Sequence, residues 1–246
     1  MILVTSANGN QGKRLVPKLL AAGHQVRACV QSEASAQALR ARSVHEVLVG
    51  DLADPAFVAR AVQGVASIYH IGPTLHANER AMGITIVDVA SAAGVGHFVF
   101  SSVLHAITTD LIQHEIKRDI EKHLLSSGLE FTILQPANYM LPHRLKSVFE
   151  ESVFRLSWSL DRFQSMVDLD DVTDVAALVL AEREWHFAAT YELVGPGRLT
   201  AHDIRRSLMA VLGRSPSSFE DFVRKEYAAI PALDRRDASA STSSGE

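Results

Sequence analysis

Cysteine is nearly absent from this chain of 246 residues, and other absences narrow its class further. The one cysteine, Cys29, excludes an internal disulfide framework and fits a reducing compartment. No apolar run reaches the roughly 18 residues that a membrane-spanning helix needs, and the chain opens on a core strand rather than a charged signal segment. Basic residues form no block, and the net charge is −4, which argues against duplex nucleic acid as a partner. We therefore expect a cytoplasmic protein without nucleic-acid or membrane partners.

What the chain does have is an apolar fraction of 47%, enough for a sizeable core, distributed over strands and helices that alternate. A first buried strand starts at Ile2, and further short strands are expected at 24–31, 44–49, 67–71, 97–101 and 131–134. Helical patterns fall between them, at 11–22, 55–62, 79–93 and 112–126. This alternation predicts an α/β fold, a Rossmann-type doubly wound parallel sheet.

A glycine-containing turn follows the first strand directly and leads into the first helix. In a glycine-spaced turn, backbone N–H groups can approach a pyrophosphate, and the positive end of the next helix stabilises its charge. The turn contains Ser6, Asn8, Gly9, Asn10, Gln11 and Gly12. Ser6 stands where the first glycine of a GxxGxxG motif would be, and a residue with a Cβ is strained if φ is positive there. Because a strand precedes, a helix follows and a second strand comes about 20 residues later, we favour dinucleotide binding over a purely structural turn.

In an open parallel sheet the ligand lies across the carboxyl ends of the strands. The residues expected there, beyond the first turn, are Gln31, Ser32, Gly50, Asp51, Leu52, His70, Ile71, Gly72, Pro73, Ser101, Ser102 and Val103. Asp51 can accept a hydrogen bond from the adenine amino group with Leu52 against the ring, or it is simply a solvated loop carboxylate. Ser101 can bind a substrate oxygen or cap the strand end.

Beyond Pro136 the order of the expected strands and helices becomes less regular. Helices are expected at 144–151, 172–181 and 201–212, with strands at 153–158 and 190–194. We interpret residues 1–136 as a dinucleotide-binding Rossmann domain and residues 137–232 as a smaller C-terminal α+β lobe built on the same fold. Residues 234–246 lack large apolar side chains, and a flexible tail is expected at 233–246.

Five stretches together resemble the NmrA-like branch of the atypical short-chain dehydrogenases/reductases. They are residues 4–12 (VTSANGNQG), 50–52 (GDL), 97–102 (HFVFSS), 128–136 (GLEFTILQP) and 191–196 (YELVGP). The resemblance implies an NAD(P)-binding domain with a small substrate lobe. Some members of this branch reduce quinones and related acceptors, and others resemble redox sensors that bind nucleotide and control a partner.

The residue after the second strand leaves the choice of cofactor open. NADP-preferring relatives usually place an arginine there, and an NAD site usually places an acid there to bind the ribose 2′-hydroxyl. Gln31 is neither, and Arg27, Arg40 and Arg42 stand in less direct positions. The resemblance alone favours NADP(H) slightly over NAD(H).

The helix expected after the fifth strand lacks the usual general acid. Short-chain reductases place a Tyr-x-x-x-Lys pair there, and this chain has Gln113 and Lys117 instead. Lys117 can still hold the nicotinamide ribose, but an amide cannot transfer a proton at neutral pH. Hydride transfer to a quinone or another delocalised acceptor depends least on this missing general acid, because resonance spreads the negative charge that develops.

Replacement proton donors, each with a purely structural alternative, are His105, His114 and Tyr139. Pro136, Ala137 and Asn138 are expected to run past the nicotinamide and to offer backbone groups to its carboxamide. Asp168 and the acids that follow it are interpreted as the cap of the next helix rather than as a catalytic cluster.

The sequence argues against two other kinds of active site, a metal site and a serine nucleophile. His114 and Glu115 begin an HExxH pattern, but Arg118 stands where its second histidine would be, so no metal site is expected. Ser101 lacks the flanking glycines of a nucleophile elbow. We therefore predict an NAD(P)H-dependent oxidoreductase that passes hydride to a conjugated carbonyl, quinone or imine-like small molecule, with a homodimer as the candidate assembly. The alternative is a non-catalytic NAD(P)-binding sensor.

Overall fold

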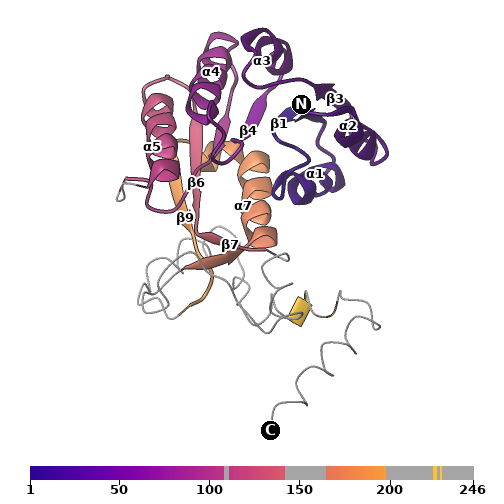
Figure 1. Ribbon diagram of the computed structural model, residues 1–246. Coiled ribbons are helices and arrows are strands. Elements are labelled where there is room, and N and C mark those ends of the chain that lie inside the picture. Colours follow the sequence, from indigo (N-terminus) through magenta and orange to yellow (C-terminus); the bar gives the residue numbers. More distant parts are fainter. Residues whose placement is uncertain (108–110, 142–164, 198–223, 226–227, 229–246) are drawn as a thin grey trace.

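The computed structural model describes residues 1–107, 111–141, 165–197, 224, 225 and 228 (Figure 1). Several predicted features lie outside these residues. They are the helices at 144–151 and 201–212, the strand at 153–158, and the tail at 233–246.

A seven-stranded parallel sheet forms the centre of the fold, with the order β3-β2-β1-β4-β5-β6-β9. The strands are β1 (Ile2–Val4), β2 (Val26–Val30), β3 (Glu46–Val49), β4 (Ser67–Ile71), β5 (Phe98–Ser101), β6 (Phe131–Pro136) and β9 (Ala189–Leu193). The order reverses between β1 and β4, which places the topological switch point beside the first turn of the chain. The predicted Rossmann-type doubly wound sheet is confirmed.

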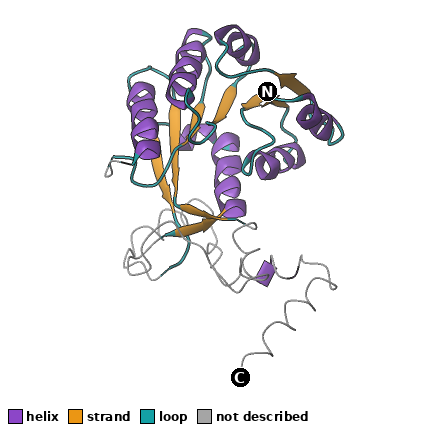
Figure 2. Cartoon of the chain, in the orientation of Figure 1, coloured by secondary structure: helices purple, strands orange, loops and turns teal. Residues whose placement is uncertain are grey.

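Helices cover both faces of this sheet (Figures 1 and 2). One apolar core packs α1 (Gly12–Ala21), α2 (Glu33–Arg40) and α7 (Leu169–Ala181) against one face. The other core packs α3 (Pro55–Val62), α4 (Glu79–Ala92) and α5 (Ile112–Leu125) against the opposite face. The inner strands β1, β2, β4, β5 and β6 are largely buried on both sides, which explains why they read as short apolar runs rather than as alternating ones.

Side-chain caps explain why several helices begin where they do. Asp54 accepts a hydrogen bond from Ala56 N at 2.9 Å at the start of α3, where Pro55 supplies a preset φ. Asp168 does the same for Asp170 N at 2.9 Å, so α7 begins at Leu169, three residues before the predicted start. The capping interpretation of Asp168 is confirmed.

The chain beyond residue 136 contributes to the large sheet as well as to a second one. β9 pairs with β6, and α7 packs against α1. A separate two-stranded parallel sheet joins β7 (Asn138–Met140) to β8 (Met166–Asp168) at the end of β6 (Figure 1). A 3₁₀ turn at Arg183–His186 leads into β9. The boundary at residue 136 stays a prediction, and β7 and β8, of three residues each, were not predicted.

Candidate active site

The turn between β1 and α1 keeps the predicted geometry although its first glycine is replaced. Ser6 adopts a left-handed conformation with φ 47°, where a side chain is strained. Its hydroxyl donates to Ile71 O at 3.0 Å, at the end of β4, and this hydrogen bond offsets part of the strain. Ser6 therefore adopts the backbone conformation that a glycine would have in this turn. Its side chain also joins the ends of β1 and β4, the two strands that flank the switch point.

The last glycine of the turn is required by packing. A Cβ on Gly12 would lie 2.4 Å from Ala7 O, a distance that no real Cβ contact shows. The first turn of α1 can therefore approach the loop only because residue 12 has no side chain. Gly9 is less constrained, since a Cβ there would lie 3.1 Å from Ser6 O.

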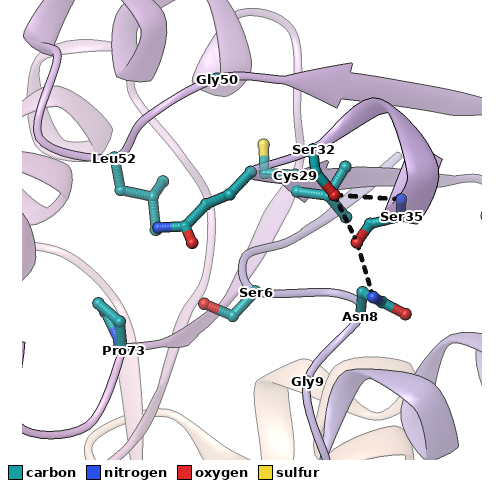
Figure 3. A pocket seen from close by; sticks show the side chains of 11 residues that line it. Ser6, Asn8, Gly9, Cys29, Ser32, Ser35, Gly50, Leu52 and Pro73 are labelled. Atoms are coloured by element: carbon teal, nitrogen blue, oxygen red, sulfur yellow. Dashed lines mark hydrogen bonds between the residues drawn. The ribbon is translucent and has the colours of Figure 1, made fainter.

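A pocket of about 360 Å³ opens at the carboxyl ends of β1, β2, β3 and β4 (Figure 3). It is lined by Ser6, Asn8, Gly9, Cys29, Val30, Gln31, Ser32, Ser35, Gly50, Leu52 and Pro73. Small or polar residues dominate the lining, and none of the described lining residues is charged. The first turn, Gln31 and Leu52 thus meet in one cavity, as predicted from their strand-end positions.

Polar groups gather on the side of the pocket where β2 meets α2 (Figure 3). Asn8 Nδ2 donates to Ser35 Oγ at 2.7 Å, and the Ser32 and Ser35 hydroxyl oxygens are 3.0 Å apart. Ser32 also caps α2 by accepting from Ser35 N at 3.3 Å. Ser32 was expected at the end of the second strand, but Ser35 was not predicted as a site residue. The helix cap pattern after the second strand was the signal that would have found Ser35.

Two of the three arginines considered for the cofactor phosphate are engaged elsewhere. Arg27 pairs with Glu46 at 2.6 Å and donates to the carbonyl oxygens of Ala61 and Gln63. Arg40 forms an ion pair with Glu33 on the surface of α2. Neither lines the pocket.

Of the two residues predicted for the adenine, only Leu52 lines the pocket, where it is buried. Asp51 is exposed, and its Oδ1 accepts from Ala53 N at 2.9 Å. This carboxylate therefore stabilises its own turn.

Gln11 belongs to the first turn by sequence, but its side chain points into the protein. The residue is 6% exposed, and its amide contacts side chains from three strands. Nε2 donates to Ser101 Oγ at 2.8 Å and to Tyr139 OH at 2.7 Å, while Oε1 accepts from Tyr69 OH at 2.6 Å. Ser101 is likewise buried, with its hydroxyl in this group. Tyr69 was not predicted, and it carries no sequence signal beyond its place in a strand.

Burial raises the pKa of Tyr139 to about 12, against a smaller lowering effect of the Ser101 hydrogen bond. The phenol therefore keeps its proton at neutral pH and can act as a donor rather than as a base.

Lys117 is buried on α5 and forms an ion pair that the sequence did not predict. Its Nζ lies 2.9 Å from Glu79 Oε1, 3.4 Å from Ser101 O and 5.2 Å from the centre of the Phe100 ring. A Cβ on Gly72 would lie 3.0 Å from Glu79 Oε1 and 3.2 Å from Lys117 Nζ. The pair thus sits directly behind the backbone of Gly72, next to Pro73 of the pocket.

Glu79 also holds the loop after β4. Its Oε2 accepts from the N–H of Leu75 at 2.8 Å, and Leu75 itself has a left-handed φ of 62°. One carboxylate therefore joins this loop to Lys117.

The two candidate histidines lie at the surface beside the start of α5. His105 is half exposed, with its Nε2 3.5 Å from Glu192 Oε1. His114 Nδ1 lies 3.4 Å from His105 O, and partial burial lowers the pKa of His114. Neither histidine takes part in the Gln11 group, so Tyr139 is the best-placed donor of the three.

The backbone after β6 is already hydrogen-bonded. Pro136 O accepts from Leu104 N at 2.9 Å, and Ala137 N donates to Leu193 O at 2.9 Å. Asn138 begins β7 and is partly exposed.

Membership of a family follows from comparison of the whole chain with known proteins. The model of the NmrA-like family matches residues 1–215. The chain belongs to this family. The predicted resemblance is therefore confirmed. This member of the family has Ser6 in its first turn and Gln113 in place of the usual tyrosine.

Two relatives are similar over nearly the whole chain. Quinone oxidoreductase 2 of Escherichia coli (strain K12) is 27% identical over 233 residues, which are 93% of this chain and 80% of that protein. The crystal structure of the Escherichia coli NADPH-dependent quinone oxidoreductase with NADPH superposes with a TM-score of 0.72 and 27% identity, over 98% of this chain and 87% of that one. Triphenylmethane reductase of Citrobacter sp., solved with NADP(H), has a TM-score of 0.70 at 23% identity, over 97% and 87% of the two chains, and shares the fold.

Neither a membrane-spanning helix nor a metal site is found among the residues that the structure describes. Among these residues, no helix combines the length and the apolarity required to cross a bilayer. No group of three His, Cys, Asp or Glu side chains in the same part of the chain is arranged to hold a metal ion.

Proposed function

We propose that this NmrA-like protein is an NADPH-dependent reductase that passes hydride to quinones or similarly conjugated small molecules. The observation that carries the proposal is the pocket at the switch point of the sheet. It is bordered by the Ser6–Gly9 turn, by the ends of β2 and β3, and by Pro73 after β4. In a doubly wound sheet this is the place where a dinucleotide binds.

The residues present fit the adenosine half of the cofactor. Gly9 and Gly50 contribute only backbone to the lining, and Leu52 offers an apolar surface to a ring. None of the described lining residues is acidic, so none of them repels a 2′-phosphate, and the similar quinone oxidoreductase uses NADPH. We therefore expect NADPH to be preferred over NADH.

Two residues serve the chemistry beyond the adenosine pocket. Bound nicotinamide in its reduced form supplies the hydride. Lys117 would hold the ribose next to Gly72, and Tyr139 would give a proton to the acceptor oxygen. Gln113, which replaces the usual tyrosine, is partly exposed and donates no proton. An acceptor that delocalises charge suits this arrangement, which is why quinones are the proposed substrates.

Two finer points complete the proposal. A small-molecule acceptor is the expected partner, and the active assembly would be a homodimer. The protein would work in the cytoplasm, where reduced NADPH and reduced Cys29 are both maintained.

Calorimetric titration with NADPH and NADH, followed by a spectroscopic assay of 1,4-naphthoquinone reduction, tests the function. We expect NADPH to bind tighter and to be oxidised when the quinone is added. Gly12→Ala should abolish binding, because its Cβ would displace the turn from Ala7 O. Gly64→Ala is the matched control, since it places a Cβ at a left-handed φ of 71° with nothing within 4 Å. Tight nucleotide binding without turnover of any quinone would favour the sensor, and absence of binding would refute both.

A further inference from the structure

Gln11 has a role that the dinucleotide turn alone does not explain. Four side chains from four different elements converge on one another: Gln11 before α1, Tyr69 on β4, Ser101 on β5 and Tyr139 on β7. Tyr69 and Ser101 are almost wholly buried, and Gln11 is 6% exposed. The side chain of a residue in the nucleotide-binding turn is therefore the centre of an interior hydrogen-bond group.

The donors and acceptors of this group determine its orientation. The fully buried Tyr69 hydroxyl has Gln11 Oε1 as its acceptor at 2.6 Å, which places the amide nitrogen on the opposite side. There Nε2 donates one N–H to Ser101 Oγ and the other to Tyr139 OH. A primary amide has two N–H donors, so both are used.

The consequence concerns the proton of Tyr139. Because the Gln11 N–H occupies an acceptor position on the phenol oxygen at 2.7 Å, the phenol's own O–H must point away from the amide. Tyr139 is partly exposed, unlike Tyr69, and the other hydrogen-bond partner of its hydroxyl in this group is Ser101. The amide thus keeps the hydroxyl proton off its own side and leaves it for Ser101 Oγ or for a bound acceptor.

We propose that Gln11 is a positioning residue that directs the Tyr139 hydroxyl proton toward the acceptor and fixes that hydroxyl to the nucleotide-binding turn. This inference rests on the function proposed above, in which Tyr139 is the proton donor. It adds that the phosphate-binding turn and the proton donor are one rigid unit, so nucleotide and donor keep a constant separation.

Reduction of the quinone requires one hydride and one proton. Bound NADPH would supply the hydride, and thus two electrons, leaving NADP+ and a quinone with a new bond to hydrogen and a negatively charged oxygen. The O–H bond of Tyr139 breaks and its proton neutralises that oxygen. The phenolate that remains, stabilised by the N–H of Gln11, takes a proton from water.

Gln11→Met tests this role, because methionine keeps the length of the side chain and removes both N–H donors. We expect kcat for naphthoquinone to fall about tenfold or more, as for loss of a general acid. The Kd for NADPH should change less than about threefold. Tyr139→Phe should lower kcat similarly, and the double variant should be no slower than Tyr139→Phe alone, because the two residues act on one step.

Tyr69→Phe is the matched control. It removes the hydrogen bond to Gln11 Oε1 and leaves the Nε2 side of the amide unchanged. If Gln11 has a merely structural role, Gln11→Met and Tyr69→Phe will both lower Tm and leave kcat unchanged. That result, or additive losses of kcat in the double variant, would overturn the proposal.

A measurement without turnover separates this inference from the proposed function. The chain has four tyrosines, so ¹³C labelling at Cζ gives few resonances, and Tyr139→Phe assigns the one that disappears. Gln11→Met should shift the Tyr139 resonance in the protein without nucleotide, and an unshifted resonance would overturn the positioning role. If the shift occurs but the parent protein neither oxidises NADPH nor reduces a quinone, the proposed function fails and its proton-transfer role with it.

Discussion

The two halves of the candidate site are built in opposite ways. The adenosine half is an open pocket of small residues and backbone, with short hydroxyl contacts such as those of Ser32 and Ser35. The reactive half consists of buried polar side chains that hold one another, with Gln11 on Tyr139 and Glu79 on Lys117. A pocket made of backbone tolerates changes that keep it open, whereas a buried polar group loses a partner with any change. We therefore expect the reactive half to be the less tolerant of substitution.

The largest effect is expected from breaking the buried ion pair. Lys117→Met leaves the Glu79 carboxylate, whose side chain is 1% exposed, without its cation. Stability should fall by about 3–5 kcal/mol, measured by urea unfolding. Adding Glu79→Met should restore most of that stability, because an apolar pair of similar volume needs no desolvated charge.

The affinity for NADPH tests the second role of Lys117, that of holding the ribose. If Lys117 holds the ribose, the stable double variant should still bind NADPH more weakly than the parent protein. A single Lys117→Met variant as stable as the parent would show that the ion pair is not buried in solution.

Acid should destabilise the protein through two buried histidines. Burial lowers the pKa of His70 to about 3, with Lys117 as a second cause, and burial lowers that of His97 to about 4, with Arg183 and His186 adding to it. Both bind protons in the unfolded chain below about pH 6.5 while the folded protein does not. The free energy of unfolding should therefore be fully retained above pH 6.5. Below it, down to about pH 4, the loss should reach about 1.4 kcal/mol per pH unit for each histidine.

Urea unfolding at a series of pH values measures this slope. His70→Asn keeps an amide near the position from which His70 Nδ1 meets Thr5 Oγ1 at 3.1 Å, and it should remove the contribution of one proton. An unchanged slope in that variant would assign the acid sensitivity to other groups.

A smaller loss is expected where the C-terminal part of the chain meets α7. Lys225 Nζ lies 2.7 Å from Asp168 Oδ2 and 2.8 Å from Asp170 Oδ2. Asp168 is buried, so Lys225→Ala should cost about 1–2 kcal/mol in thermal unfolding. Lys122→Ala, at the exposed end of α5, is the control, and an equal loss there would remove any special role for Lys225.

The smallest effect on stability is expected in the open half, from Ser6→Gly. Relief of the left-handed strain and loss of the hydrogen bond to Ile71 O are each worth about 1 kcal/mol, so the stability should change by less than that. NADPH should bind a few-fold tighter, because the backbone of the turn is then more accessible. Ser43→Gly, with φ 59° and no place in the pocket, is the control for strain alone. Weaker binding in Ser6→Gly would instead make the serine hydroxyl a nucleotide ligand.

Local patterns were sufficient to predict most of the fold and the open half of the site. The bounds of α3 agree with those predicted, because Asp54 and Pro55 mark its start. The strand ends, and with them Leu52 and Gln31, follow from the topology of any doubly wound sheet. β7 and β8 could not be predicted in this way, because each strand has three residues, too few to show a periodic pattern.

The reactive half depended on contacts that no local pattern encodes. Gln11 was expected to face the cofactor because of its place in the turn, yet its amide reaches Tyr139 far along the chain. Glu79 reads as an ordinary acid in the first turn of a helix, where it would complement the helix dipole. Only the packing of α4 against α5 brings it to Lys117.

The place of β9 in the sheet has a consequence for biosynthesis. β6 is hydrogen-bonded to β9 along its length, from Thr132 with Ala189 to Pro136 with Leu193. During translation β6 is complete long before its neighbour emerges, a delay of roughly 3–10 s at about 5–20 residues per second. For that time the nascent chain exposes an apolar, unpaired strand edge, which is the kind of surface that chaperones recognise and that aggregation begins from.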